Sequence, residues 1–119
     1  MERVCLLGST GSIGVQTLDI IRTHAERFKV DTLVAHSRWQ ELAAQAREFN
    51  ARCVVIGDKS HYTDLCNALS GTGIEVEAGN EAIINAAASY RSDLLVNALV
   101  GYAGLHPTLA AIHSDKRIA

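Results

Sequence analysis

Residues 8–14 read Gly-Ser-Thr-Gly-Ser-Ile-Gly, so glycines recur at every third position with hydroxyl side chains between them. A glycine loop that leads into a helix can bind a phosphate, because backbone N–H groups and the positive end of the helix dipole face the anion. We expect Gly8 to make a tight turn, Gly11 to let a pyrophosphate approach the backbone, and Gly14 to let the helix pack closely on the strand. The hydroxyls of Ser9, Thr10 and Ser12 can add hydrogen-bond donors to the phosphate site or can cap the helix.

Other motifs with glycine and serine fail at particular positions of this loop. A Walker loop ends in Gly-Lys-Ser/Thr, but residues 8–14 contain no lysine. A nucleophile elbow has glycines two residues before and two residues after its serine, and neither Ser9 nor Ser12 has both. The spacing Gly-x-x-Gly-x-x-Gly is a variant of the dinucleotide-binding motif, and it is weak evidence alone. Between a strand and a helix it predicts nucleotide binding, the alternative being a purely structural turn.

The end of the second apolar run, residues 29–35, indicates which nucleotide the site would take. Sites for NAD usually carry Asp or Glu at this point, where the carboxylate binds the ribose hydroxyls. This chain has His36, Ser37 and Arg38 instead. The cation of Arg38, helped by Ser37 and His36, can bind a 2′-phosphate that a carboxylate would repel. NADP is therefore favoured over NAD, and the alternative is that Arg38 is a solvated loop cation.

Short apolar runs alternate with helical patterns along the chain and must position these side chains. The runs are residues 3–7, 29–35, 53–56, 74–76, 93–98 and the beginning of another at 117–119. Helical patterns cover residues 12–25, 39–49, 61–69, 81–88 and 106–113. In the first helix one broad face is expected to hold Ile13, Leu18, Ile20, Ile21 and Ala25. This alternation predicts an α/β domain, a Rossmann-like parallel sheet with helices on both faces.

The carboxyl ends of parallel strands border one crevice, so residues at the end of the run at 93–98 and directly after it can also line a cofactor. These residues are Asn97, Ala98 and Leu99. Gly101 and Gly104 more simply serve the turn into the next helix, and His106 its cap. The sequence therefore predicts a cofactor site built from three loops at one edge of the sheet.

Length and composition exclude several classes of protein. The 119 residues allow one domain. The 11 Lys and Arg against 13 Asp and Glu give a net charge of −2, and the sequence has no basic stripe that would bind nucleic acid. No apolar run approaches the ~18 residues that would span a membrane, and no signal peptide is expected. Three cysteines, an odd count without paired spacing, suit a reducing cytoplasm.

Catalytic and metal-binding groups do not emerge from the residue types. Cys53, His61 and Cys66 lack a zinc-binding spacing, and Cys5 and Cys53 lie in predicted strands, so buried thiols are expected instead of ligands. Glu75 and Glu77 are expected on one solvated face of an edge strand. We therefore predict no catalytic residue and no metal ligand in this chain.

The chain resembles the deoxyxylulose-phosphate reductoisomerases from end to end. The resemblance rests on the glycine loop, on Thr-Leu-Asp at 17–19, on residues 44–49 and 54–56, and on Asn-Ala-Leu-Val-Gly-Tyr-Ala-Gly-Leu-His-Pro-Thr-Leu-Ala-Ala-Ile at 97–112. It implies an NADPH-dependent enzyme of the non-mevalonate isoprenoid pathway, which converts 1-deoxy-D-xylulose 5-phosphate to 2-C-methyl-D-erythritol 4-phosphate. It also implies a divalent metal (Mg, Mn or Co) that chelates this phosphosugar, and a cytoplasmic homodimer without nucleic-acid or membrane partners.

Residue by residue, the resemblance assigns cofactor contacts to Thr10, Gly11, Ser12 and Ile13 beside Gly8, and to residues 36–38. The family often has Gly-Lys/Arg-Asn at 36–38, so the cation of this chain is displaced by one position. In the family the strand at residue 117 continues into Ala-Asn-Lys-Glu, and the metal ligands and substrate site lie further on. We therefore expect residues 1–119 to be the NADP-binding domain of a longer enzyme, inactive as a fragment.

Two other functions stay open on the sequence. One is a self-standing nucleotide-sensing regulatory module, whose sheet would need no further strands. The other is a different NADP-dependent dehydrogenase of the semialdehyde or short-chain type. Those enzymes need a catalytic Cys or a Tyr-x-x-x-Lys motif, and neither Tyr90 nor Tyr102 has a lysine four residues later.

Overall fold

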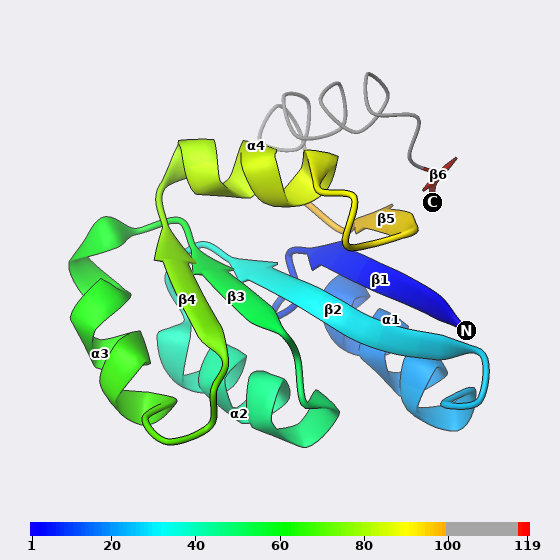
Figure 1. Cartoon of the computed structure of the whole chain (residues 1–119), viewed down its shortest axis with the longest axis horizontal. Coiled ribbons are helices and arrows are strands. Elements are labelled where there is room, and N and C mark those ends of the chain that lie inside the picture. Colours follow the sequence, from blue (N-terminus) through cyan, green and yellow to red (C-terminus); the bar gives the residue numbers. More distant parts are fainter. Residues whose placement is uncertain (100–116) are drawn as a thin grey trace.

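The computed structural model of the protein describes residues 1–99 and 117–119. Six strands of this part form one sheet with only parallel pairings, in the order β4-β3-β2-β1-β5-β6 (Figure 1). The strands are β1 Glu2–Leu7, β2 Phe28–Ala35, β3 Cys53–Ile56, β4 Glu75–Ala78, β5 Leu94–Asn97 and β6 Arg117–Ile118. The predicted parallel α/β sheet is confirmed.

The helices match the predicted patterns closely. They are α1 Ser12–Thr23, α2 Trp39–Phe49, α3 Tyr62–Ala68 after a 3-10 turn at Lys59–His61, and α4 Asn80–Ala88. The helix expected at 106–113 lies outside the described residues. The longest helix of the described part, α1, has 12 residues, and none there is long and apolar enough to cross a membrane.

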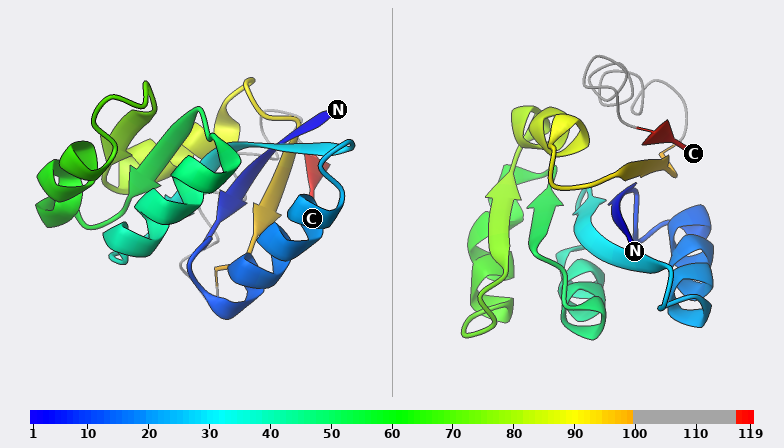
Figure 2. Two further views of the ribbon diagram at one scale, coloured as in Figure 1. Left: turned by 90° about the horizontal axis from the view of Figure 1, so that it is seen from below. Right: turned by 45° about the vertical axis from the view of Figure 1, so that its right-hand side comes forward.

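Helices cover both faces of the sheet, as predicted. Figures 1 and 2 show α1, α2 and α3 on one face and α4 on the other. Strand β1 supplies both cores by alternation: Val4 and Leu6 pack with Leu18 of α1, whereas Leu7 packs with Ala87 of α4. Because both faces of the central strands are buried, these strands read as continuous apolar runs.

The order of the strands reverses beside β1. From β1 the chain steps to β2, β3 and β4 on one side, and α4 then leads back to β5 on the other side of β1. In open parallel sheets the crevice at such a reversal, outside the carboxyl ends of the strands, is where ligands bind. The glycine loop follows β1 at this point, so the topology places the predicted site at the reversal.

The buried face of α1 is narrower than the sequence predicts. Leu18 and Ile21 are buried as expected, but Ile13 and Ile20 are 53% and 58% exposed, and Ala25 is exposed beyond the end of the helix. The expectation for these three residues was wrong because the flank of α1 that carries Ile13 and Ile20 faces away from α2, and no element among residues 1–99 and 117–119 covers it. Only one side of the helix therefore meets the sheet.

The outer strand β4 carries exposed Glu75 and Glu77, which confirms the predicted solvated edge. Glu75 accepts from Arg52 at 3.1 Å, and Arg52 also donates to both carboxylate oxygens of Asp31 at 3.0 and 3.2 Å. Asp31 is only 7% exposed, and the two hydrogen bonds from Arg52 compensate its buried negative charge. The group of ion pairs joins β2, the start of β3 and β4 at the end of the sheet away from the glycine loop.

Arg3 and Asp93 join β1 to the start of β5 and make the fold sensitive to acid. The Arg3 guanidinium donates to both Asp93 carboxylate oxygens at 3.1 and 3.2 Å, and its backbone N–H donates at 2.9 Å, which lowers the pKa of Asp93 to about 2. A carboxyl whose pKa is lower in the folded state stabilises the fold above its ordinary pKa, and this stabilisation is lost as the pH falls toward about 2.

We therefore expect Asp93→Asn to flatten the loss of unfolding free energy between about pH 4 and about pH 2. Urea denaturation at several pH values measures this. Because the two side chains are 45% and 42% exposed, solvent screens the pair and the difference between the slopes is small. Equal slopes for the variant and the parent would show that the ion pair contributes nothing.

Candidate functional site

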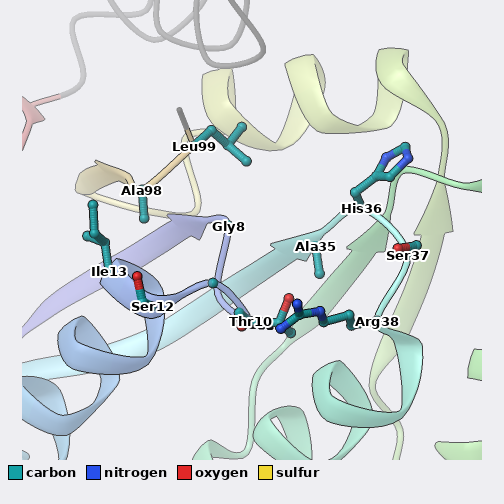
Figure 3. A pocket seen from close by; sticks show the side chains of 11 residues that line it. Gly8, Thr10, Ser12, Ile13, Ala35, His36, Ser37, Arg38, Ala98 and Leu99 are labelled. Atoms are coloured by element: carbon teal, nitrogen blue, oxygen red, sulfur yellow. Dashed lines mark hydrogen bonds between the residues drawn. The ribbon is translucent and has the colours of Figure 1, made fainter. Parts of the chain in front are cut away.

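A cavity of about 290 Å³ opens beside the glycine loop, at the carboxyl ends of β1, β2 and β5 (Figure 3). Three segments line it, with Gly8, Thr10, Gly11, Ser12 and Ile13 from the loop, Ala35, His36, Ser37 and Arg38 after β2, and Ala98 and Leu99 after β5. The structure thus brings together all of the residues predicted for the cofactor except Asn97. Ala35 was missed, and its place directly before His36 in a buried strand is the signal that points to it.

Gly8 makes the tight turn that the sequence predicts. Its φ of +82° is in the region that favours glycine, and its N–H donates to the carbonyl of Val34 at 2.8 Å. A Cβ at this position would lie 3.2 Å from the backbone of Ala98 and 3.2 Å from a methyl carbon of Leu99. The turn after β1 and the turn after β5 are therefore packed against each other, which closes one side of the cavity.

Gly14 is the glycine of the loop whose surroundings leave the least space for a side chain. A Cβ here would lie 2.0 Å from the carbonyl oxygen of Gly8 and 2.7 Å from Cα of Ser9. The helix does pack closely at Gly14, but its partner is the loop after β1 and not the strand that the sequence predicts. Gly11 differs, because its added Cβ would meet only the Gly8 oxygen, at 3.7 Å. The fold needs glycine at 14, whereas at 11 it leaves space for a side chain or for a ligand.

The first turn of α1 has no side-chain cap. Its N-cap is Gly11, so the expectation that a loop hydroxyl caps the helix was wrong. Ser9 is fully buried and does not line the cavity, because the loop turns its side chain inward and its carbonyl accepts from the Gln45 amide at 3.0 Å. The N–H groups at the start of α1 therefore stay available to an anion in the cavity.

Arg38 supplies the positive charge of the cavity. Its guanidinium reaches across to the glycine loop and donates a long hydrogen bond of 3.4 Å to the carbonyl of Thr10 (Figure 3). It lies 3.8 Å from the Glu41 carboxylate and the side chain is 64% exposed, so it is free to turn toward a ligand. In Figure 3 the side chains of His36 and Ser37 point away from this guanidinium. Only one of the three predicted polar residues after β2 thus faces the glycine loop.

Asn97 holds the turn after β5 and does not line the cavity. Its side-chain oxygen accepts from the N–H of Leu99 at 3.0 Å, and the N–H of Ala98 donates to the carbonyl of Leu7 at 2.9 Å. These bonds place Ala98 and Leu99 at the cavity wall. Gly101, Gly104 and His106, which were expected to shape the next turn, lie outside the described residues.

The described part of the chain gathers one group of potential metal ligands, Cys53, Glu75 and Glu77, far from the glycine loop. Burial and the neighbouring Glu77 carboxylate, 3.3 Å from the sulfur, raise the pKa of the Cys53 thiol to about 12. A protonated thiol is a poor ligand, and hard divalent ions such as magnesium prefer oxygen. The group does not fit the divalent metal that the family resemblance implies, in agreement with the prediction of a buried thiol at Cys53.

Residues 4–119 match the family model described as 1-deoxy-D-xylulose 5-phosphate reductoisomerase. The curated protein of that name from Laribacter hongkongensis is 42% identical over 118 residues, which are 99% of this chain and 30% of that relative. The one from Nitrobacter winogradskyi is 47% identical over 119 residues, 100% of this chain and 29% of that relative. The chain thus spans about 30% of the length of the curated relatives that it matches.

Solved structures share the fold. The reductoisomerase from Zymomonas mobilis in complex with NADPH superposes with a TM-score of 0.93 at 42% identity, covering 99% of this chain and 31% of that one. A reductoisomerase in complex with NADPH, fosmidomycin and magnesium gives a TM-score of 0.93 at 37% identity, covering 99% of this chain and 29% of that one. Two proteins that hold NADPH therefore share the fold of this chain.

Proposed function

The chain belongs to the 1-deoxy-D-xylulose 5-phosphate reductoisomerase family, and from that premise we propose that residues 1–119 are its NADPH-binding domain. One observation carries the proposal: a single cavity at the reversal of the strand order joins the glycine loop, the cation of Arg38 and the turn after β5. Dinucleotides bind at this place in sheets of this kind.

Different residues of the cavity bind different parts of the dinucleotide. The uncapped N–H groups of α1 face the pyrophosphate, which approaches the backbone at Gly11, where the structure leaves space. Arg38 turns from Thr10 toward the 2′-phosphate that distinguishes NADPH from NADH. Ala98 and Leu99 close the opposite wall. Bound NADPH would supply the hydride of the reduction, and these residues would hold the dinucleotide in the cavity.

The whole enzyme is proposed to convert 1-deoxy-D-xylulose 5-phosphate to 2-C-methyl-D-erythritol 4-phosphate, with a divalent metal and as a cytoplasmic homodimer. The relatives of that name and the magnesium in a structural neighbour support this proposal. The absence of disulfides among the three cysteines fits a reducing compartment, and the net charge of −2 fits a protein without nucleic-acid or membrane partners.

Calorimetric titration of the chain with NADPH and with NADH tests the proposed function. We expect weak, saturable binding of NADPH and at least about tenfold weaker binding of NADH, because NADH lacks the charge-assisted hydrogen bonds to the 2′-phosphate. Equal or tighter binding of NADH would refute the assignment of the cofactor. Binding of neither dinucleotide would refute the assignment of the domain.

A further inference from the structure

The side chain of His36 is turned away from Arg38, although the two residues line the same cavity (Figure 3). The backbone around it is fixed by the turn after β3, because the N–H of Gly57 donates to the carbonyl of Ala35 at 2.9 Å and the N–H of Asp58 donates to the carbonyl of His36 at 2.8 Å. His36 also lines a neighbouring cavity of about 650 Å³, together with Asn80 at the start of α4. The imidazole therefore stands between two cavities, on the α4 side of the cofactor cavity.

Gly57 provides the space that the imidazole occupies. A Cβ at Gly57 would lie 2.9 Å from Nδ1 of His36 and 3.4 Å from its Cα. Contacts of less than 3.0 Å are too short for a carbon atom, so any larger residue would move the ring. The position of the His36 ring is thus set by the turn after β3, which contributes no residue to the lining of the cofactor cavity.

The half of the cavity on the α4 side differs chemically from the half at Arg38. Leu99 packs against the core cluster that contains Ala87 of α4. Ala35 and Ala98 also line the cavity, but they pack with the core cluster of α1 and α2 on the other face of the sheet. His36 contributes the one aromatic ring of the described lining. One end of the cavity therefore carries the cation of Arg38, and the end on the α4 side offers the apolar side chain of Leu99 and the flat ring of His36.

We infer that His36 packs against the adenine base of the bound dinucleotide, with Gly57 as its positioning residue, and that it does not bind the 2′-phosphate. The inference rests on the proposed function. A dinucleotide carries a flat base next to a ribose phosphate, which matches the two ends of the cavity. Aromatic side chains stack on bases whatever the phosphates attached to the ribose. His36 thus contributes affinity for both dinucleotides, and Arg38 determines the preference for NADPH over NADH.

The test measures the affinities of NADPH and NADH for His36→Ala and His36→Phe. His36→Ala is expected to weaken both dinucleotides about tenfold and to leave their ratio unchanged, because the adenine is common to both. His36→Phe keeps a flat ring and is expected to retain both affinities within about threefold. His24, near the end of α1 and outside the cavity, offers a matched control, and His24→Ala is expected to leave both affinities unchanged.

Gly57→Ala tests the positioning role. It is expected to lower both affinities about as much as His36→Ala, and to have no further effect when His36→Ala is already present. The inference would be overturned if His36→Ala lowered the affinity for NADPH more than the affinity for NADH. It would also be overturned if His36→Ala lowered neither affinity. Binding of neither dinucleotide to the parent chain would instead overturn the proposed function, and the inference with it.

Discussion

Gly14→Ala is expected to lower the unfolding free energy by about 3 kcal/mol and to abolish NADPH binding. The new methyl carbon would lie 2.0 Å from the Gly8 oxygen and 2.8 Å from the Ser9 carbonyl carbon. These are backbone atoms that cannot rotate away, so α1 must move off the loop or the loop must change shape. Either movement displaces the helix N–H groups from the phosphate. Urea denaturation measures the stability and calorimetric titration measures the binding.

Gly11→Ala is the matched control for Gly14→Ala. Its backbone φ of −78° suits alanine, and the added carbon would meet only the Gly8 oxygen at 3.7 Å. We expect the unfolding free energy to stay within about 1 kcal/mol of the parent or to rise slightly. NADPH binding should nevertheless be lost, because the methyl group fills the approach of the pyrophosphate. Full stability and binding in Gly14→Ala, or unchanged binding in Gly11→Ala, would contradict the roles assigned to these glycines.

Arg38→Asp is expected to weaken NADPH binding about 100-fold and NADH binding about twofold or less. The substitution removes charge-assisted hydrogen bonds worth about 1.5–3 kcal/mol and sets a carboxylate against the 2′-phosphate. NADH has no phosphate there, and a carboxylate can accept from its ribose hydroxyls. Titration of both dinucleotides at constant ionic strength measures the two affinities.

Arg27→Asp makes the same change of charge at the other end of the sheet. Arg27 precedes β2, and its carbonyl accepts from the N–H of Glu2 at the start of β1. This variant is expected to leave both affinities within about twofold of the parent, because more than a Debye length of screened solvent separates it from the cavity. Equal losses of NADPH and NADH affinity in Arg38→Asp would remove its assigned role.

The elements of this fold could be predicted because each has a local signal. The bounds of α2 and β3 agree with the predicted ranges 39–49 and 53–56. In α2 the apolar residues recur with helical spacing, and β3 is a short apolar run stopped by Gly57. The glycine loop was placed correctly for the same reason, since its spacing and its position between a strand and a helix are both visible in the sequence.

The directions of side chains in the site could not be predicted, because partners distant in sequence decide them. Ser9 is turned inward, where its carbonyl meets the Gln45 amide from α2. The ring of His36 occupies the space left by Gly57 in the turn after β3. Ile13 and Ile20 have the spacing of a buried face, yet only the packing of α1 on the sheet shows that they lie outside it.

The amide chemical shifts of the chain during titration with NADPH test the central claim most directly. A cavity that serves as the second cavity of this comparison, of about 390 Å³, lies at the amino ends of the strands, away from the two cavities beside His36, and is lined by Met1, Phe28 and Phe49, among others. We predict saturable shifts for residues 8–13, 36–38 and 98–99, and none for the residues of that second cavity. Saturable shifts at the second cavity alone, or no shifts in the glycine loop at saturation, would contradict the account.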